Sequence, residues 1–362
     1  MNSPALAPRT AAALNGKVRV LIVDDSVVIR HLLREALGSD PGIEVVGAEA
    51  NGVAALAQIP VLKPDLVTLD IEMPQMDGLE TLRRIRKDFP RLRTLMFSTL
   101  TTRGAAATFE ALSLGADDYV AKAANGGELD KSLANLRAEL LPKIRQFFAL
   151  PGQAQAKPEP SRTPAQRPGP RLRPQVLAIG VSTGGPNALA TLIPMLPASF
   201  PLPVVVVQHM PPTFTRLLAE RLDAAGPLAV REAEDQMEVA PGRVIIARGD
   251  HHLRLRKAER RVVCVLDQGP PENSCRPAAD VLFRSAAEVY SGGVLSLVLT
   301  GMGYDGRKGV EAVKAAGGYS IVQDRATSVV WGMPSAVAEA GLADRVLPLP
   351  EIAPELVRLA QG

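Results

Sequence analysis

Residues 180–186, with the sequence GVSTGGP, could carry nucleophilic chemistry through Ser182. The apolar run 176–179 in front of them is typical of a buried strand, and residues 187–193 behind them predict a helix with Pro186 in its first turn. A serine in such a glycine-flanked turn is lifted clear of the backbone and faces the N–H groups of the helix. The pattern fits a nucleophile elbow, but by itself it also fits a tight turn or a loop that cradles a phosphate.

A nucleophilic serine needs a general base, and His209 is the best candidate among the four histidines. It comes shortly after the β-branched run 204–207, which predicts a strand buried on both faces. His209 would then stand at the same carboxyl edge of the sheet as Ser182. His251 and His252 precede a predicted strand and His31 lies in a predicted helix, so all three are weaker candidates. A purely structural role for a lone histidine is the alternative.

The base needs an acid to orient it, and Asp305 meets this need. It lies in the glycine-rich turn 301–306, between a predicted strand at 295–300 and a predicted helix at 308–316. Asp305 would hold one imidazole nitrogen of His209 and stabilise the imidazolium; alternatively, it only caps the turn. The order Ser, His, Asp along the chain differs from that of the α/β-hydrolases, chymotrypsin and subtilisin, so none of these folds is expected.

A second group of polar residues lies in the N-terminal part of the chain, where predicted strands end. These residues are Asp24, Asp25, Asp70, Ser98 and Lys122. In open α/β sheets this carboxyl edge is where ligands bind. Three carboxylates would repel one another there, and Mg²⁺ relieves such repulsion, while a lysine and a hydroxyl hold phosphoryl oxygens. The pattern predicts phosphorylation of one of the aspartates; acidic loop ends that merely cap helices are the alternative.

Strands and helices must alternate to bring these residues to sheet edges. In the N-terminal part, the sequence predicts strands at 18–23, 45–48, 66–69, 95–97 and 118–121, and helices at 27–37, 53–59, 78–86, 105–114 and 129–141. In the C-terminal part it predicts strands at 176–179, 204–207, 244–247, 253–255, 262–265 and 296–299. Such alternation favours α/β domains with parallel sheets. Arg254 and Arg256 alternate with leucines, which favours a more exposed or antiparallel strand there.

Length and composition indicate about two domains in 362 residues. We expect a disordered leader at 1–16, a domain at 17–148, a solvated proline-rich linker at 149–174 and a second domain at 175–362. Hydrophobic residues make up 46% and charged residues 22%, as in ordinary globular proteins, and no apolar run is long enough to cross a membrane. Cys264 and Cys275 have no metal-ligand spacing, which favours a reduced, cytoplasmic protein with incidental thiols.

The N-terminal domain resembles a response-regulator receiver domain, which has a flavodoxin-like fold with a five-stranded parallel sheet. The resemblance rests on Asp24-Asp25, Asp70, Met73-Pro74, Met76-Asp77-Gly78, Ser98 and Lys122. It implies that Asp70 accepts the phosphoryl group and that Asp24 and Asp25, with Asp70, bind Mg²⁺. Ser98 would be the switch hydroxyl, and Lys122 would contact the phosphoryl group.

The C-terminal domain resembles the protein-glutamate methylesterase of bacterial chemotaxis, a doubly wound, mostly parallel α/β domain. The resemblance rests on residues 180–186, Gln208-His209-Met210-Pro211, Arg276-Pro277, Asp280-Val281-Leu282-Phe283 and residues 300–306. It implies that Ser182 is the nucleophile, His209 the base and Asp305 the orienting acid. The backbone N–H groups of Thr183 and Met302 would stabilise the oxyanion.

The chain departs from the two family patterns at two positions. Receivers usually carry a proline after the conserved lysine, and here that residue is Ala123. The methylesterase motif commonly has a histidine just before Arg-Pro, and here that residue is Cys275.

The resemblance implies hydrolysis of glutamate γ-methyl esters on chemoreceptor helices, with deamidation of receptor glutamines as a related activity. A histidine kinase would phosphorylate the receiver, which otherwise blocks the catalytic site, and the pathway would provide sensory adaptation. Ester hydrolysis itself would need no cofactor. We expect a cytoplasmic monomer that neither binds nucleic acid nor inserts into a membrane.

Two other functions are alternatives, and features of the sequence disfavour both. A phosphate- or dinucleotide-binding sensor would fit the strand–glycine–helix unit, but residues 180–186 lack the Gly-x-Gly-x-x-Gly pattern. A receiver-controlled DNA-binding regulator is disfavoured by the net charge of only +3 and by the lack of a recognisable recognition-helix unit.

Overall fold

A computed structural model describes residues 16–99, 101–122, 129–148, 150 and 173–361. The chain divides into two compact units, residues 1–153 and 154–362, and each is described by itself. The predicted leader, nearly all of the predicted linker and Ala123 lie outside the described residues. Within the described part of the chain, no helix combines the length and apolar character needed to span a bilayer.

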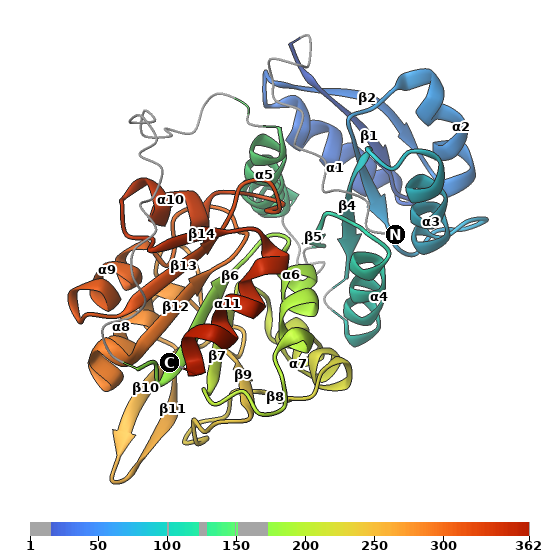
Figure 1. The fold of residues 1–362 in the computed structure, drawn as a ribbon. Helices are drawn as coiled ribbons and strands as arrows, with labels where there is room; N and C mark the ends of the chain where they lie inside the picture. The colour runs from blue at the N-terminus through green and yellow to red at the C-terminus, as the bar shows by residue number, and fades with distance from the viewer. Residues whose placement is uncertain (1–15, 100, 123–128, 149, 151–172, 362) are drawn as a thin grey trace. The chain divides into compact units, whose positions relative to one another are not determined.

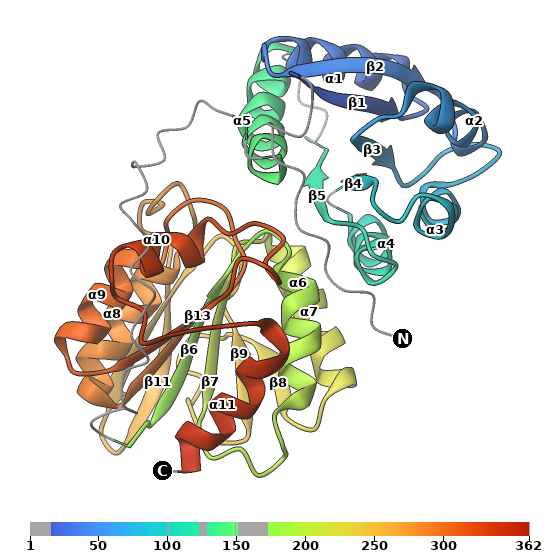
Figure 2. The ribbon, with the colours of Figure 1, turned by 45° about the horizontal axis from the view of Figure 1, so that its top comes forward.

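The first unit is built on a five-stranded parallel sheet with the strand order β2-β1-β3-β4-β5. Its strands are β1 (Val18–Val23), β2 (Ile43–Glu49), β3 (Leu66–Asp70), β4 (Arg93–Ser98) and β5 (Asp118–Ala121). Its helices are α1 (Val27–Gly38), α2 (Gly52–Leu62), α3 (Gly78–Asp88), α4 (Thr102–Ser113) and α5 (Leu129–Phe147). Helices α1 and α5 pack together on one face, and α2, α3 and α4 cover the other (Figure 2). The predicted α/β fold with a five-stranded parallel sheet is confirmed.

Helix α5 continues to Phe147, six residues beyond its predicted end at residue 141. Pro142, the next residue after the predicted end, lacks an N–H group and so interrupts the hydrogen-bond ladder of the helix. Packing after the proline outweighs this cost, because Ile144 and Phe147 are buried and Arg145 binds the carboxylate of Asp40. The predicted helix end at residue 141 is therefore wrong because tertiary contacts, which the local sequence does not encode, extend α5.

The second unit contains a seven-stranded sheet with the order β14-β13-β12-β6-β7-β9-β8, parallel throughout (Figure 1). Its strands are β6 (Val176–Val181), β7 (Val204–Gln208), β8 (Ala229–Glu232), β9 (Arg243–Ile246), β12 (Val294–Val298), β13 (Tyr319–Gln323) and β14 (Arg345–Leu347). Its helices are α6 (Gly185–Leu192), α7 (Pro212–Ala225), α8 (Ala279–Tyr290), α9 (Arg307–Ala315), α10 (Met333–Glu339) and α11 (Leu349–Gln361), with short 3₁₀ turns at Ile193–Met195 and Ser291–Gly293.

Strands β10 (His252–Ala258) and β11 (Arg261–Asp267) form a separate antiparallel hairpin. This confirms the interpretation of the alternating arginines, since Arg254 and Arg256 are exposed while Leu253 and Leu255 are buried. Strands β8, β13 and β14 were not expected. Strands β8 and β14 have only four and three residues, and β13, with the sequence YSIVQ, has polar residues at its second and last positions. None of them therefore contains an apolar run long enough to stand out from the surrounding loops.

The last turn of α5 offers a test of the packing that overrides Pro142. The Phe147 ring is 1% exposed, and the guanidinium of Arg93 lies 5.7 Å from its centroid. Phe147→Ala should destabilise the first unit by about 3–5 kcal/mol, through lost burial and the cavity left behind. Urea unfolding followed by circular dichroism measures this loss. The fluorescence of the single tryptophan, Trp331, reports the second unit and should not shift.

The exposed Arg84 on α3 provides the control, because its truncation to alanine removes only surface contacts. If the urea unfolding transition of the first unit were unchanged in Phe147→Ala, the end of α5 would not stabilise that unit.

Candidate active site

Ser182 stands in a tight turn between β6 and α6, as the strand–turn–helix pattern predicted. Its backbone N–H donates to Thr300 O at 3.0 Å, and Gly185 N donates back to Ser182 O at 2.8 Å. Gly184 has a φ of 77°, a left-handed conformation that favours glycine, and Pro186 lies in the first turn of the helix. Ser182 is half-buried at the start of this turn.

Three neighbouring strands bring the predicted site residues to one edge. Strand β6 lies between β12 and β7, and Val181 pairs with Gln208 in a parallel register. Because His209 follows Gln208, its N–H reaches the carbonyl of Val181 at 3.2 Å, next to Ser182. Asp305 lies beyond the end of β12, on the other side of β6. The expectation that these residues share a carboxyl edge agrees with the strand order.

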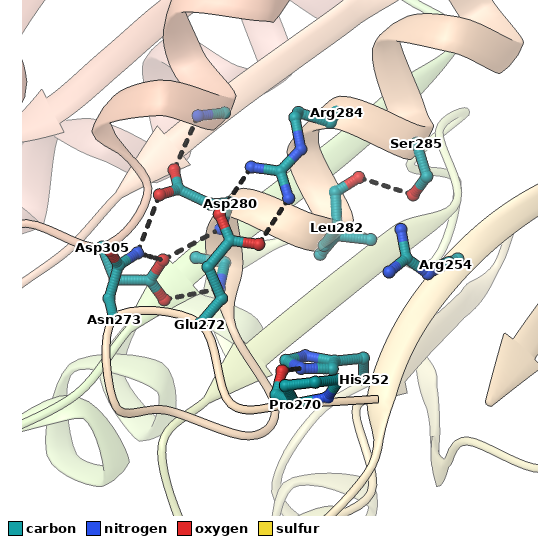
Figure 3. Close-up of polar contacts among 12 residues, drawn as sticks. His252, Arg254, Pro270, Glu272, Asn273, Asp280, Leu282, Arg284, Ser285 and Asp305 are labelled. Carbon is teal, nitrogen blue, oxygen red and sulfur yellow. Dashed lines mark hydrogen bonds and ion pairs between the residues drawn. The ribbon is translucent and has the colours of Figure 1, made fainter. Parts of the chain in front are cut away.

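His209 and Asp305 are in direct contact, with 2.8 Å between His209 Nε2 and Asp305 Oδ2. Asp305 is 2% exposed and accepts three further hydrogen bonds: from Ala279 N at 2.6 Å, Asp280 N at 3.1 Å and Asn273 Nδ2 at 2.9 Å. The first two donors belong to the N-terminus of α8, where the helix dipole also favours a negative charge (Figure 3). Asp305 is thus held as a carboxylate facing the imidazole.

The electrostatics of this pair follow from the same contacts. Burial opposes the charge of Asp305, but hydrogen bonds from His209 and from the N–H groups of Ala279 and Asp280 lower its pKa to about 2. Burial also opposes the charge of His209, but the hydrogen bonds with Asp305 and Cys275 outweigh it and raise the pKa to about 10. A carboxylate only accepts, so Nε2 carries a proton and Nδ1 is the nitrogen with the free lone pair in the neutral ring.

The nitrogen Nδ1 of His209 faces Cys275, whose Sγ lies 3.5 Å away. The same sulfur lies 3.4 Å from the carbonyl oxygen of Asn273. Among the side chains that the structure describes, no hydrogen bond joins the Ser182 hydroxyl to His209. Catalytic hydrogen bonds often tighten only when substrate is bound, so Ser182 keeps its place as the candidate nucleophile.

Backbone N–H groups beside Ser182 could stabilise a negative oxygen. Within the described residues, no protein group accepts a hydrogen bond from the N–H of Thr183 or Met302. A side chain on Gly301 would meet Ser182 Cβ at 2.9 Å, so the turn that carries Met302 passes directly against the serine. The Thr300 hydroxyl donates to Thr183 O at 2.9 Å and links the two turns. Thr183 directly follows Ser182, and Met302 directly follows Gly301 in the turn against it; their role as oxyanion donors stays a prediction.

The buried Gln208 and Asp280 and the half-buried Asn273 support this site, and none of them was assigned a role from the sequence. Gln208 Nε2 donates to Ser182 O at 2.9 Å and braces the turn. Asp280 accepts from Gly309 N at 2.6 Å and from Asn273 Nδ2 at 2.8 Å, which fixes the amide that also binds Asp305 (Figure 3). These residues lie in the family motifs or beside them, but their partners are far away in the sequence.

The other three histidines have different surroundings. His251 is half-buried, and its Nδ1 lies 3.2 Å from the carbonyl oxygen of Gly249. His252 is 2% exposed at the start of β10, and its Nε2 contacts the carbonyl oxygen of Pro270 at 2.9 Å (Figure 3). His31 lies exposed on α1 of the first unit. Within the described part of the second unit, neither His251 nor His252 shares a hydrogen bond with Asp305, which favours His209 as the base.

The predicted phosphorylation site forms a cluster at the carboxyl edge of the first unit. Lys122 Nζ lies 2.8 Å from Asp70 Oδ1 and 3.0 Å from Asp24 Oδ2. Burial, only partly offset by the hydrogen bond from Lys122, raises the pKa of Asp70 to about 6. Burial lowers the pKa of Lys122, but its contacts with Asp70 and Asp24 outweigh this and raise it. The buried Ser98 hydroxyl donates to Gly104 O at 3.0 Å.

The acidic residues of this cluster fit a magnesium ion. Asp24, Asp25 and Asp70 each present a carboxylate oxygen within 4.8 Å of the others. Mg²⁺ binds proteins through one or more carboxylates and keeps several waters, and it would complete a site for a phosphoryl group.

Both units of the chain match known protein families. The family model described as CheB methylesterase matches residues 177–356, and the response regulator receiver domain model matches residues 20–134. A protein-glutamate methylesterase/protein-glutamine glutaminase of Trichodesmium erythraeum (strain IMS101) is 49% identical over 350 residues, which cover 94% of this chain and 99% of that protein. The chain belongs to the CheB methylesterase family.

Further relatives agree with this membership. A protein of the same name from Thermotoga maritima is 45% identical over 343 residues, covering 94% of this chain and 98% of the relative. The crystal structure of the CheB methylesterase catalytic domain of that organism is 49% identical, has a TM-score of 0.51, and covers 52% of this chain and all of its own. The predicted family, fold class and enzyme class are thereby confirmed; the roles of individual residues stay predictions.

Asn273 offers a test of how Asp305 is positioned. Asn273→Ala removes one donor from a buried carboxylate, a bond worth about 1.5–3 kcal/mol, so the kcat of ester hydrolysis should fall roughly tenfold or more. KM should change little, because Asn273 acts through Asp305. Steady-state kinetics separate the two parameters.

The exposed Gln268, whose amide contacts Asp250 at 3.2 Å, provides a matched amide-to-alanine control. If Asn273→Ala kept the full kcat, the carboxylate would not need this donor for its orientation.

Proposed function

We propose that Ser182, His209 and Asp305, the proposed triad, hydrolyse glutamate γ-methyl esters on chemoreceptor helices. The observation that carries the proposal is the 2.8 Å contact between His209 and Asp305 at the sheet edge where Ser182 stands. Deamidation of receptor glutamines would use the same acyl-enzyme route, because an ester and an amide differ only in the leaving group. The relatives are named for both activities.

In the proposed mechanism, Ser182 Oγ attacks the ester carbonyl while His209 Nδ1 takes the hydroxyl proton. The backbone N–H groups of Thr183 and Met302 donate to the oxyanion, each worth about 3 kcal/mol in comparable sites. The intermediate then expels methanol, which receives the proton from His209, and leaves an acyl-enzyme. Water, deprotonated by the same nitrogen, releases the glutamate. Asp305 stabilises the imidazolium throughout.

We further propose that phosphorylation of Asp70 by a histidine kinase activates the esterase. Asp24 and Asp25, with Asp70, would hold Mg²⁺, which neutralises phosphoryl charge, and Lys122 already lies within 2.8 Å of the acceptor carboxylate. The unphosphorylated receiver would restrict access to the esterase, so that demethylation follows kinase output and provides adaptation. We place this activity in the cytoplasm, where the unpaired Cys264 and Cys275 would stay reduced.

Replacement of the nucleophile tests the triad. Ser182→Ala should lower kcat for methanol release from methylated receptor membranes by roughly 10⁴-fold or more, since the acyl-enzyme can no longer form. Phosphorylation of Asp70 should be unaffected in this variant, which shows that the first unit is folded, and unchanged Trp331 fluorescence shows that the second unit is folded. Full esterase activity in Ser182→Ala would overturn the assignment.

Removal of the acceptor tests the regulation. Asp70→Asn should keep the basal esterase rate but lose its increase with a phosphorylated histidine kinase, because the amide cannot take the phosphoryl group. Asp88→Asn, an exposed aspartate at the end of α3, should respond as the unmodified chain does. Normal activation of Asp70→Asn, or a lower basal rate after deletion of residues 1–174, would contradict the proposed restraint.

A further inference from the structure

Cys275 places a soft ligand against the nitrogen that the proposed mechanism uses. Its Sγ lies 3.5 Å from His209 Nδ1, while the opposite nitrogen of the ring is bound to Asp305 at 2.8 Å. Together the three residues present ligand atoms within 4.8 Å of one another. Of these groups, the thiol and the imidazole Nδ1 face each other, and both are donor types that zinc sites use, while the carboxylate holds the opposite nitrogen of the ring.

The spacing of the sulfur and nitrogen matches tetrahedral zinc. With a Zn–N distance of about 2.0–2.1 Å, a Zn–S distance of about 2.3 Å and a tetrahedral angle, the two donor atoms stand about 3.5 Å apart. Cys275 Sγ and His209 Nδ1 have this separation, so both could bind one ion with little movement of either side chain.

Asp305 prepares the ring for this role. Metal-binding histidines usually donate their other N–H to a carboxylate, which fixes the tautomer and the ring orientation. The Nε2–Asp305 bond does this and leaves the Nδ1 lone pair directed at Cys275. Asp305 is itself held by two N–H groups of α8 and by Asn273, so the ligand side of the ring is preorganised.

We propose that Cys275 and His209 form an inhibitory binding site for Zn²⁺ or a similar thiophilic divalent cation. The ion would bind the sulfur, which loses its proton to solvent, and Nδ1, with water completing the tetrahedron. A metal on Nδ1 occupies the lone pair that would take the proton of Ser182, so binding blocks ester hydrolysis. The metal site itself stands whether or not chemoreceptors are the substrate.

Any test must distinguish metal binding at this site from metal binding at the acidic cluster of the receiver unit. Asp24, Asp25 and Asp70 offer only oxygen donors, which suit Mg²⁺, whereas a thiolate favours zinc. Excess Mg²⁺ therefore occupies the receiver cluster and leaves Cys275 available. The second cysteine, Cys264, is fully buried in the hydrophobic core and serves as the control.

Direct binding is tested by titrating the full chain with Co²⁺ in excess Mg²⁺. Coordination by Cys275 should produce a thiolate-to-cobalt charge-transfer band in the unmodified chain and in Cys264→Ser. The band should be absent in Cys275→Ser and Cys275→Ala and weakened in His209→Ala, with Trp331 fluorescence confirming that each variant is folded. A band that persists without Cys275, or no band in the unmodified chain, would overturn the proposal.

Inhibition is tested by the ratio of esterase rates with and without Zn²⁺, so that a change in the basal rate cancels. Cys275→Ser should raise the half-inhibitory zinc concentration roughly tenfold or more, as loss of a supporting group in metal sites does. A chelator should restore the rate of the unmodified chain. Equal inhibition of Cys275→Ser and the unmodified chain would show that zinc acts elsewhere. An inactive chain that still shows the cobalt band would reject the proposed esterase mechanism and not the metal site.

Discussion

Asp305 is a carboxylate with only 2% of its surface exposed, and a buried charge is tolerated only when donors surround it. Four donors do so: the ring of His209, two backbone N–H groups at the start of α8, and the amide of Asn273. His209 follows β7, the two N–H groups belong to the first turn of α8, and Asn273 lies in the loop before α8. The need to satisfy one carboxylate therefore joins β7, β12, α8 and the loop before α8 at a single point.

This requirement sets how closely α8 approaches the sheet and its neighbours. A side chain at Gly180 would meet Ala279 Cβ at 2.7 Å, and one at Gly309 would meet Phe283 Cβ at 2.6 Å. Glycines thus let β6 and α9 come close enough for the N-terminus of α8 to reach Asp305. The receiver unit solves the same problem differently, since there Lys122 supplies the positive charge beside Asp70.

The sequence predicted a shared sheet edge for Ser182, His209 and Asp305, and the strand order agrees, because residues that follow neighbouring parallel strands lie at the same edge whatever the loops between them do. The sequence was not enough to find Asn273 or Asp280 as supports, since their contacts depend on a loop whose conformation has no periodic pattern. Asn273 and the residue after it both have positive φ angles, 52° and 62°. The sequence pattern also failed to predict the continuation of α5 through Pro142 and the short edge strands β8 and β14. The reason is related, because tertiary packing determines these elements and local propensity does not.

The loop before α8 also decides what meets the free nitrogen of His209. Asp305 raises the pKa of the ring through Nε2, whereas Cys275 acts on Nδ1, the nitrogen that must receive a proton from Ser182. Nδ1 can act as a base only when its lone pair is free. The contact with Cys275 and the proton transfer from Ser182 both use this lone pair, so they compete. Asp305 is fixed by its donors and contacts the other nitrogen. The availability of the base therefore depends on the position of Cys275. Of the two described side chains that contact the ring, Cys275 is half-buried on a loop and Asp305 is 2% exposed, so Cys275 is the more accessible one.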